Sequence, residues 1–258
     1  MKKLFWTIFL CLAATTATAQ NDTLPRDPDT ARAAQIIDRY LEYVDFSKIS
    51  TDSMICVVTK IVSRSHPDDT SMIYRWYAKP MYSRIEMYQD GKMTNGLYGD
   101  GTGTFKMFMQ GPRTWATITQ DSYFDLMMSR DIRGALYNWR SRGAEVSFAG
   151  EYDYEGHKVN RVFVTCPRIF DRYYFFEQES GLLFMATEIE HIYGDGRITR
   201  NAQKVDWRAW NEFVPFRGCM MPSIESYQAY EDITFLYHSY HMEPLNKKLF
   251  TEDFHQIP

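Results

Sequence analysis

Long apolar runs are nearly missing from this chain. The one near the N-terminus, residues 4–12, is shorter than the roughly 18–20 residues that a membrane-spanning helix needs, and no later segment approaches that length. An excess of basic charge is also missing, since 29 Lys and Arg are set against 33 Asp and Glu, a formal net charge of −4. A nucleic-acid-binding protein needs a basic patch, so this class of partner is excluded.

Cysteine is scarce, with 4 in the whole chain. Cys11 lies in the N-terminal apolar run, which leaves Cys56, Cys166 and Cys219. An odd number excludes a fully paired disulfide framework. We predict three small buried residues on strands. One disulfide among them stays open as the alternative in an oxidising compartment.

The motifs of common enzyme classes are missing as well. The sequence contains no GxSxG, HExxH, CxxC or Walker pattern. His238 and His241 could suggest a metal site, but residues three apart on a strand point to opposite faces. We therefore expect no catalytic activity, metal or cofactor. A hydrolase is the remaining enzymatic alternative, because catalytic groups can be distant in sequence.

The stretch GDGTGTFKM, residues 99–107, could be mistaken for a phosphate-binding loop. Such a loop must open a helix, so that free N–H groups point at the anion. Here the residues that follow are β-branched, aromatic and apolar, which favours a strand. Asp100-Gly101 is a strong hairpin signal. The glycines therefore predict a turn between two strands.

The N-terminus has the pattern of a secretory signal peptide. Lys2 and Lys3 precede the apolar run, and Ala17-Thr18-Ala19 is a small-residue cleavage site. We expect residues 1–19 to be removed and the mature chain to be periplasmic. Residues 20–30 predict a flexible lead-in, and residues 31–258 a single domain.

Aromatic residues are abundant, at 16%, together with 14 Met. Apolar residues at three- and four-residue steps predict a helix from Ala31 to Val44, capped by Asp29 or Thr30. Residues 121–142 repeat this pattern, with Gly143 at the end. The other segments alternate with period two, so we predict about eleven strands. The fold class is thus mostly β, one curved antiparallel sheet with helices on one face.

Two further features have open interpretations. The aromatic residues of segment 207–218 predict either a loop packed over the sheet edge, which we favour, or an exposed partner patch: Trp207, Trp210, Phe213 and Phe216. Thr23, Thr30 and Ser53 each follow Asp and precede an apolar residue, a pattern of O-glycosylation in some Gram-negative lineages. Thr30 has the alternative role of a helix cap.

An ordered series of motifs resembles a known family. Arg84-x-Glu86 leads through Gly91-Lys92 to Tyr98-Gly99-Asp100-Gly101, and Gly150-Glu151-Tyr152-Asp153-Tyr154-Glu155-Gly156 follows the central helical segment. Glu177-x-x-Ser180-Gly181-Leu182 then opens a long strand. The close is Phe213-Val214-Pro215-Phe216-Arg217-Gly218-Cys219, with Phe250-x-x-Asp253-Phe254 near the end. Across nearly the whole mature chain, this series resembles the LolA-like superfamily of outer-membrane lipoprotein-sorting proteins, although segment 207–218 departs from the short carrier pattern.

The resemblance implies an open half-barrel of about eleven strands, with helices covering its concave mouth. It also implies a monomeric carrier that binds a lipid or an acylated lipoprotein and meets a membrane-associated donor or receptor protein. The alternative is a lipid-sensing regulatory or protein-interaction subunit in the periplasm with the same fold. Apolar side chains on the strands and the central helical segment are the expected lipid-cavity residues: Trp76, Ile85, Met87, Phe105, Met107, Met109, Phe124, Met127, Met128, Leu136 and Trp139.

Overall fold

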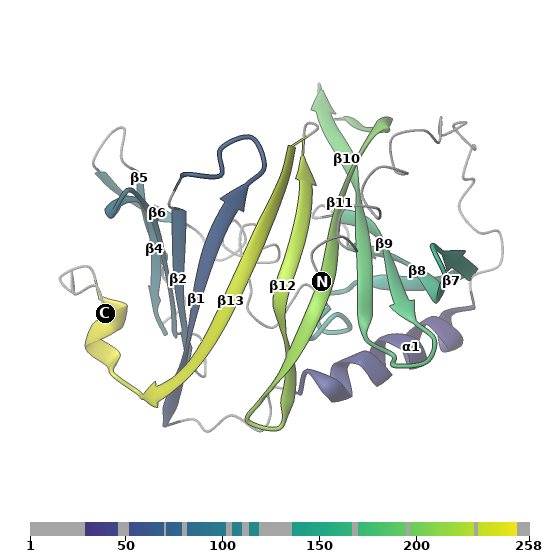
Figure 1. Cartoon of the computed structure of the whole chain (residues 1–258), viewed down its shortest axis with the longest axis horizontal. Coiled ribbons are helices and arrows are strands. Elements are labelled where there is room, and N and C mark those ends of the chain that lie inside the picture. Colours follow the sequence, from purple (N-terminus) through teal and green to yellow (C-terminus); the bar gives the residue numbers. More distant parts are fainter. Residues whose placement is uncertain are drawn as a thin grey trace, which may run out of the picture.

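The protein is analysed as a computed structural model (Figure 1). It describes residues 29–45, 52–69, 71–78, 82–101, 105–109, 114–118, 136–166, 170–194, 197–229 and 232–251. The elements are α1 (Thr30–Tyr43), β1 (Ser53–Ser63), β2 (Ser71–Ala78), β3 (Tyr82–Gln89), β4 (Lys92–Asp100), β5 (Phe105–Met109), β6 (Thr114–Ile118), β7 (Glu145–Tyr154), β8 (His157–Cys166), β9 (Phe170–Glu177), β10 (Leu183–Gly194), β11 (Arg197–Phe216), β12 (Cys219–Ala229), β13 (Asp232–Pro244) and the 3₁₀ helix η2 (Lys247–Phe250).

All strands form one antiparallel sheet of 13 strands, in the order β6-β5-β4-β3-β2-β1-β13-β12-β11-β10-β9-β8-β7. Two meanders, β1–β6 and β7–β13, are joined side by side through β1 and β13, which pair from Ser53 with Pro244 to Ser63 with Thr234. The sheet bends strongly, so that β7 and β8 lie at a steep angle to β12 and β13 (Figure 1). The sequence prediction of a single open, curved sheet is confirmed. The described strands number 13, two more than the approximate prediction of eleven, and the short strand β6 is one that the sequence did not single out.

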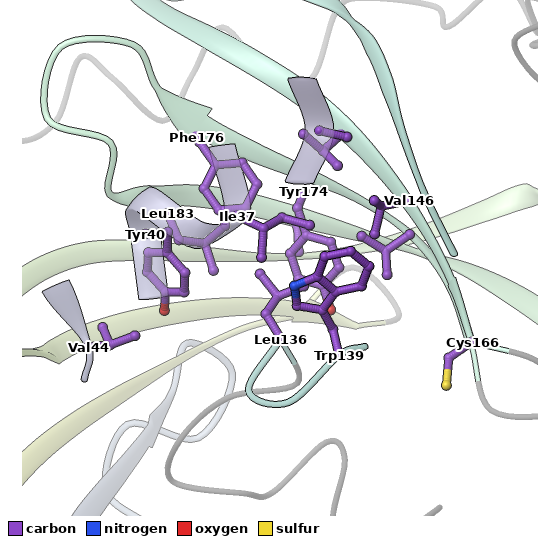
Figure 2. Packing of buried hydrophobic residues seen from close by; sticks show 14 residues of the cluster. Ile37, Tyr40, Val44, Leu136, Trp139, Val146, Cys166, Tyr174, Phe176 and Leu183 are labelled. Atoms are coloured by element: carbon purple, nitrogen blue, oxygen red, sulfur yellow. The ribbon is translucent and has the colours of Figure 1, made fainter. Parts of the chain in front are cut away.

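Helix α1 packs where the sequence predicted an amphipathic helix. Asp29 caps it, with its side chain accepting a hydrogen bond from the Arg32 N–H. Its apolar side packs on β7–β10 and forms the largest core cluster (Figure 2). Ile37 and Tyr40 of α1 lie there against Tyr174 and Phe176 of β9. A second described helix, η2, is a single short turn. Among the described residues, no helix has the length and apolar character needed to cross a membrane.

Charged side chains of α1 form ion pairs and hydrogen bonds with neighbouring segments. Arg32 forms an ion pair with Glu151 of β7, and Arg39 donates to the carbonyls of the β9–β10 turn, at 2.7 Å to the Glu179 oxygen. Arg140 binds both carboxylate oxygens of Asp38, and this hydrogen bonding lowers the pKa of Asp38. The helix is thus tied to β7, to the β9–β10 turn and to segment 136–143.

The central segment differs in part from the prediction of a helix over 121–142. Residues 136–143 form consecutive turns, with positive φ at Asn138 and Gly143. Leu136 and Trp139 pack in the α1 core cluster (Figure 2). Residues 121–135 lie outside the described part of the chain. The apolar spacing thus included two residues that are buried, Leu136 and Trp139, although the described backbone there is not helical.

Segment 207–218 was predicted to be a loop, but most of it is a strand. Residues 207–216 continue β11 and pair with β12, with register shifts on either side of Glu212. Trp210 and Phe213 pack against the α1 core cluster, and Phe216 packs near Cys219. The side chain of Trp207 is not described. A 20-residue strand with such irregularities loses the simple alternation that identifies shorter strands.

The two faces of the sheet carry separate cores. Because paired residues share a face, Ile55 and Val57 of β1 point to the side on which α1 packs, with Met221 and the partly buried Tyr137. We call this the α1 face. Met54 and Cys56 point to the opposite side, where η2 covers them, and we call that the η2 face. The described α-helix lies on one face, as predicted, and the short 3₁₀ turn η2 lies on the other.

The described cysteines, Cys56, Cys166 and Cys219, are free and buried, as the sequence predicted. Burial raises the pKa of Cys56 to about 12, so its thiol stays protonated at neutral pH. Thr30 begins α1 and Ser53 begins β1. Thr23 lies outside the described residues, and glycosylation stays a prediction.

The glycine-rich stretch is a turn followed by a strand, as predicted. Gly101 has φ of +85°, and a Cβ there would lie 2.9 Å from the Tyr82 ring. Gly91 has φ of +73°, but a Cβ there would meet nothing within 4 Å. We expect Gly91→Ala to lower the free energy of unfolding by about 1 kcal/mol through backbone strain.

Gly101→Ala should lower the free energy of unfolding by at least about 2 kcal/mol, because the clash of the new Cβ with the Tyr82 ring adds to the backbone strain. Urea unfolding of both variants tests this. Equal losses would mean that Tyr82 moves away freely and that the close approach carries no energy.

Candidate functional site

An apolar surface lies on the α1 face of the first meander. Pairing aligns Ile85, Leu97 and Met107 across β3, β4 and β5, and Ile73 and Met87 form the adjacent row. Ile85 and Leu97 are buried, whereas the other three are only half-buried. We call these five residues the apolar stripe. Its half-buried members, Ile73, Met87 and Met107, keep apolar side chains of β2, β3 and β5 in contact with solvent.

The expected lipid-cavity residues separate into groups. Ile85, Met87 and Met107 belong to the apolar stripe. Trp76 pairs with Cys56 and Arg84 and lies on the η2 face, so one cavity cannot be lined by both Trp76 and Ile85. The remaining candidates either pack in another part of the fold or have no described side chain. Leu136 and Trp139 are in the α1 core cluster, the backbones of Phe105 and Met109 belong to β5 without described side chains, and Phe124, Met127 and Met128 lie outside the described residues.

Beside the apolar stripe lies a group of buried charged and polar side chains that sequence reasoning missed. We call Thr59, Arg75, Arg208, Glu225 and His238 the polar cluster. Glu225 is its centre, with a side chain only 5% exposed. Its Oε2 accepts from Arg208 Nε, and its Oε1 lies 3.2 Å from His238 Nε2, close enough for an ion pair but short of a directed hydrogen bond.

A hydrogen-bonded chain continues from His238 to β1 and β2. Arg75 Nη2 donates to Thr59 Oγ1 at 2.8 Å, and Thr59 Oγ1 lies 2.8 Å from His238 Nδ1. Because Arg75 has only protons to offer, the Thr59 oxygen accepts from it. The Thr59 hydroxyl thus links the guanidinium of Arg75 to the imidazole of His238.

Opposing effects set the charge of Glu225. Burial by itself would raise the pKa of this carboxyl group. The positive charge of Arg208, the contact with His238 and the charge of Arg75 outweigh burial and lower the pKa to about 2. Burial raises the pKa of Tyr40 and Tyr240, and the negative charge of Glu225 adds to this. The cluster thus holds a buried carboxylate beneath α1.

Thr59, His238 and Glu225 have the order of a nucleophile, base and acid. The Thr59 side chain is fully buried in the middle of β1, and its oxygen already accepts from Arg75. A nucleophile must reach a substrate carbonyl, which this oxygen cannot do. The arrangement is therefore a structural ion-pair network and does not support the hydrolase alternative.

The histidine pair behaves as the sequence predicted. His238 points to the α1 face through its pairing with Thr59, whereas His241 pairs with Cys56 and points to the η2 face. Among the described residues, no group of three or more His, Cys, Asp or Glu could hold a metal ion. Sequence reasoning had no signal for the polar cluster, because its members lie on five strands, β1, β2, β11, β12 and β13, and the two halves of the group meet only through the β1–β13 pairing.

Comparisons with known proteins rest on structure alone. No family model and no curated protein matches the chain. A LolA superfamily protein from Nitrosomonas europaea is 14% identical with a TM-score of 0.57, over 86% of this chain and 98% of that one. An outer membrane lipoprotein-sorting protein domain from Vibrio parahaemolyticus is 5% identical with a TM-score of 0.55, over 87% and 98%.

A DUF1329 family protein from Desulfovibrio piger is 10% identical with a TM-score of 0.54, over 86% of this chain and 98% of that one. At these identities the likeness establishes the fold. The chain has the fold of the LolA superfamily and of lipoprotein-sorting domains, as the ordered motifs predicted, and its sheet spans nearly the full length of each of these structures.

Proposed function

We propose that this chain is a periplasmic, non-enzymatic carrier that binds the acyl chains of a lipid or an acylated lipoprotein in outer-membrane sorting. In this proposal residues 1–19 are the signal peptide, and residues 31–258 form the binding domain. The apolar stripe carries the proposal. It offers half-buried Ile and Met side chains on adjacent strands of a fold that lipoprotein-sorting domains share. No nucleic acid, metal or cofactor is part of it.

The stripe suits a flexible apolar ligand. Met side chains adapt to irregular chains because they are unbranched and polarizable. Burying each methylene contributes about 0.8 kcal/mol, so a long acyl chain is held firmly and still transfers to a more apolar receptor. The neighbouring polar cluster cannot take up such a chain, which confines it to β2–β5. Ile85, Met87 and Met107 are therefore the retained candidates among the described residues.

A charge placed on the stripe tests this proposal. We expect Met87→Asp and Met107→Asp each to weaken binding of a fluorescent long-chain fatty acid at least about tenfold, because burying a carboxylate against apolar surface costs more than 1.4 kcal/mol. Titration of residues 20–258 measures the affinity. Tyr237→Asp is the matched control, since Tyr237 is 43% exposed on the η2 face and should leave binding unchanged.

Native mass spectrometry of the same chain, purified from a periplasmic extract, then identifies the bound lipid or acylated peptide. A chain that stays empty with every lipid and lipopeptide offered would contradict the carrier function. It would favour a protein-interaction or regulatory role, with the stripe covered by the chain's own side chains.

A further inference from the structure

The η2 face of β2–β4 holds a short segment of the chain's own C-terminal region. Residues 245–251 leave β13 and cross to β3 and β4, as Figure 1 shows for η2. Phe250 is fully buried and Leu249 is 5% exposed. The Phe250 ring lies 5.2 Å from that of Tyr82, and both residues pack with Trp76. The segment thus inserts two adjacent apolar side chains between aromatic residues of the sheet.

The buried side chain of Arg84 binds backbone carbonyl groups of this segment. Arg84 Nη1 donates to the carbonyl oxygens of Leu249, at 2.6 Å, and Thr251, at 3.3 Å. Its other nitrogens bind Glu86, Nε at 2.7 Å, and Tyr88 donates to the second Glu86 oxygen at 2.9 Å. Glu86 and Tyr88 therefore orient the guanidinium so that one nitrogen faces the two carbonyls.

These contacts have the components of a peptide-binding site. Main-chain carbonyls are bound by a fixed donor, which gives affinity that does not depend on side-chain identity, and apolar side chains enter an aromatic surface, which gives specificity. Lys247 and Lys248 remain exposed, with the Lys247 ammonium 5.9 Å from the Tyr82 ring centre. Only residues 245–246 lie between β13 and η2. The helix η2 is therefore held on the sheet mainly by its own docking contacts.

We propose that the η2 face of β2–β4 is a peptide-docking site that the chain's own residues 245–251 keep closed. The partner that fits it is a protein segment with the same chemistry, an adjacent Leu-Phe pair with unpaired carbonyls. A covalently tethered segment has an effective concentration in the millimolar range, so the site opens to a partner only when this segment is displaced.

Peptide binding to the full-length chain tests the proposal. The probe is a fluorescein-labelled peptide of residues 243–251, and the receptor is the Leu249→Ala/Phe250→Ala chain, whose own segment has lost its apolar anchors. This chain should bind the peptide at least tenfold more tightly than the unchanged chain, in which the site is occupied. Equal affinities, or no binding by the folded variant, would overturn the proposal.

Three controls locate the binding. A Phe250→Ala peptide should bind at least tenfold more weakly, whereas a Lys248→Ala peptide should bind like the original, since Lys248 is exposed. Arg84→Lys in the receptor should weaken binding at least tenfold, because an ammonium cannot keep both the Glu86 contacts and the two carbonyls. Undiminished binding by this receptor would place the peptide elsewhere and overturn the site.

A second format avoids a destabilised receptor. A protease site placed between Asn246 and Lys247 allows the natural segment to be cut after the chain has folded. The cut chain should take up the labelled peptide, and the uncut chain should not. Failure of the cut chain to exchange its segment would show that the docking is permanent and would overturn the proposal. Fatty-acid binding on the opposite face should be unchanged throughout.

Discussion

Glu225→Gln is expected to lower the free energy of unfolding by about 3–5 kcal/mol at pH 7, because it removes the negative partner of a buried ion-pair network. Arg208 and Arg75, both only partly exposed, would keep their charges without the carboxylate that now offsets them. Urea denaturation measures the loss. Glu212→Gln is the matched control, since Glu212 is exposed on the neighbouring strand and its replacement should change stability by less than about 0.5 kcal/mol.

The loss of stability in Glu225→Gln should depend on pH. The folded-state pKa of Glu225 is about 2, below its ordinary 4.5, so its contribution is fully present above pH 4.5 and is lost as the pH falls towards 2. At about 1.4 kcal/mol per pKa unit, the total is about 3 kcal/mol. The stability difference between the unchanged chain and Glu225→Gln should therefore shrink by about this amount across that window. A difference that stays constant would contradict the role of the carboxylate charge.

Glu86→Leu is expected to cost about 3–5 kcal/mol, because it strands the guanidinium of Arg84 in a buried site on the η2 face. The double change Arg84→Met/Glu86→Leu should be less destabilising than Glu86→Leu alone, since no unpaired buried charge is left. Urea unfolding of the two variants, with Arg84→Met alone, completes the cycle. If the double variant lost the sum of both single effects, the two side chains would act independently and the ion pair would contribute nothing.

The sequence was most informative where structure depends on near neighbours. Asp29 and the spacing of Ile36, Ile37 and Tyr40 were enough to predict α1, since capping and a 3.6-residue period are local properties. The hairpin after Asp100-Gly101 followed in the same way. Alternation even gave the correct partition of β3, with Ile85 and Met87 on one face and Arg84 and Glu86 on the other.

What each face meets could not be predicted from that alternation. Charged residues suggest a solvated side, yet Arg84 and Glu86 are buried because η2, more than 160 positions later, covers them. Trp76 was grouped with Ile85 for its apolar character, although the register places it with Arg84. Glu225 gave no signal, since its partners come from other strands. These features depend on long-range pairing, which period and propensity do not encode.

The pairing of β1 with β13 has a consequence for how the chain folds. These strands join the two meanders, and contacts such as that between Thr59 and His238 span 179 positions. Until β13 is available, β1 and β12 are both unpaired edges, which attract other chains. Closing so long a loop precedes any reward from the contacts it forms, so folding should be slow, on the order of milliseconds to seconds. During that interval the unfinished sheet should be more prone to aggregation than the finished protein.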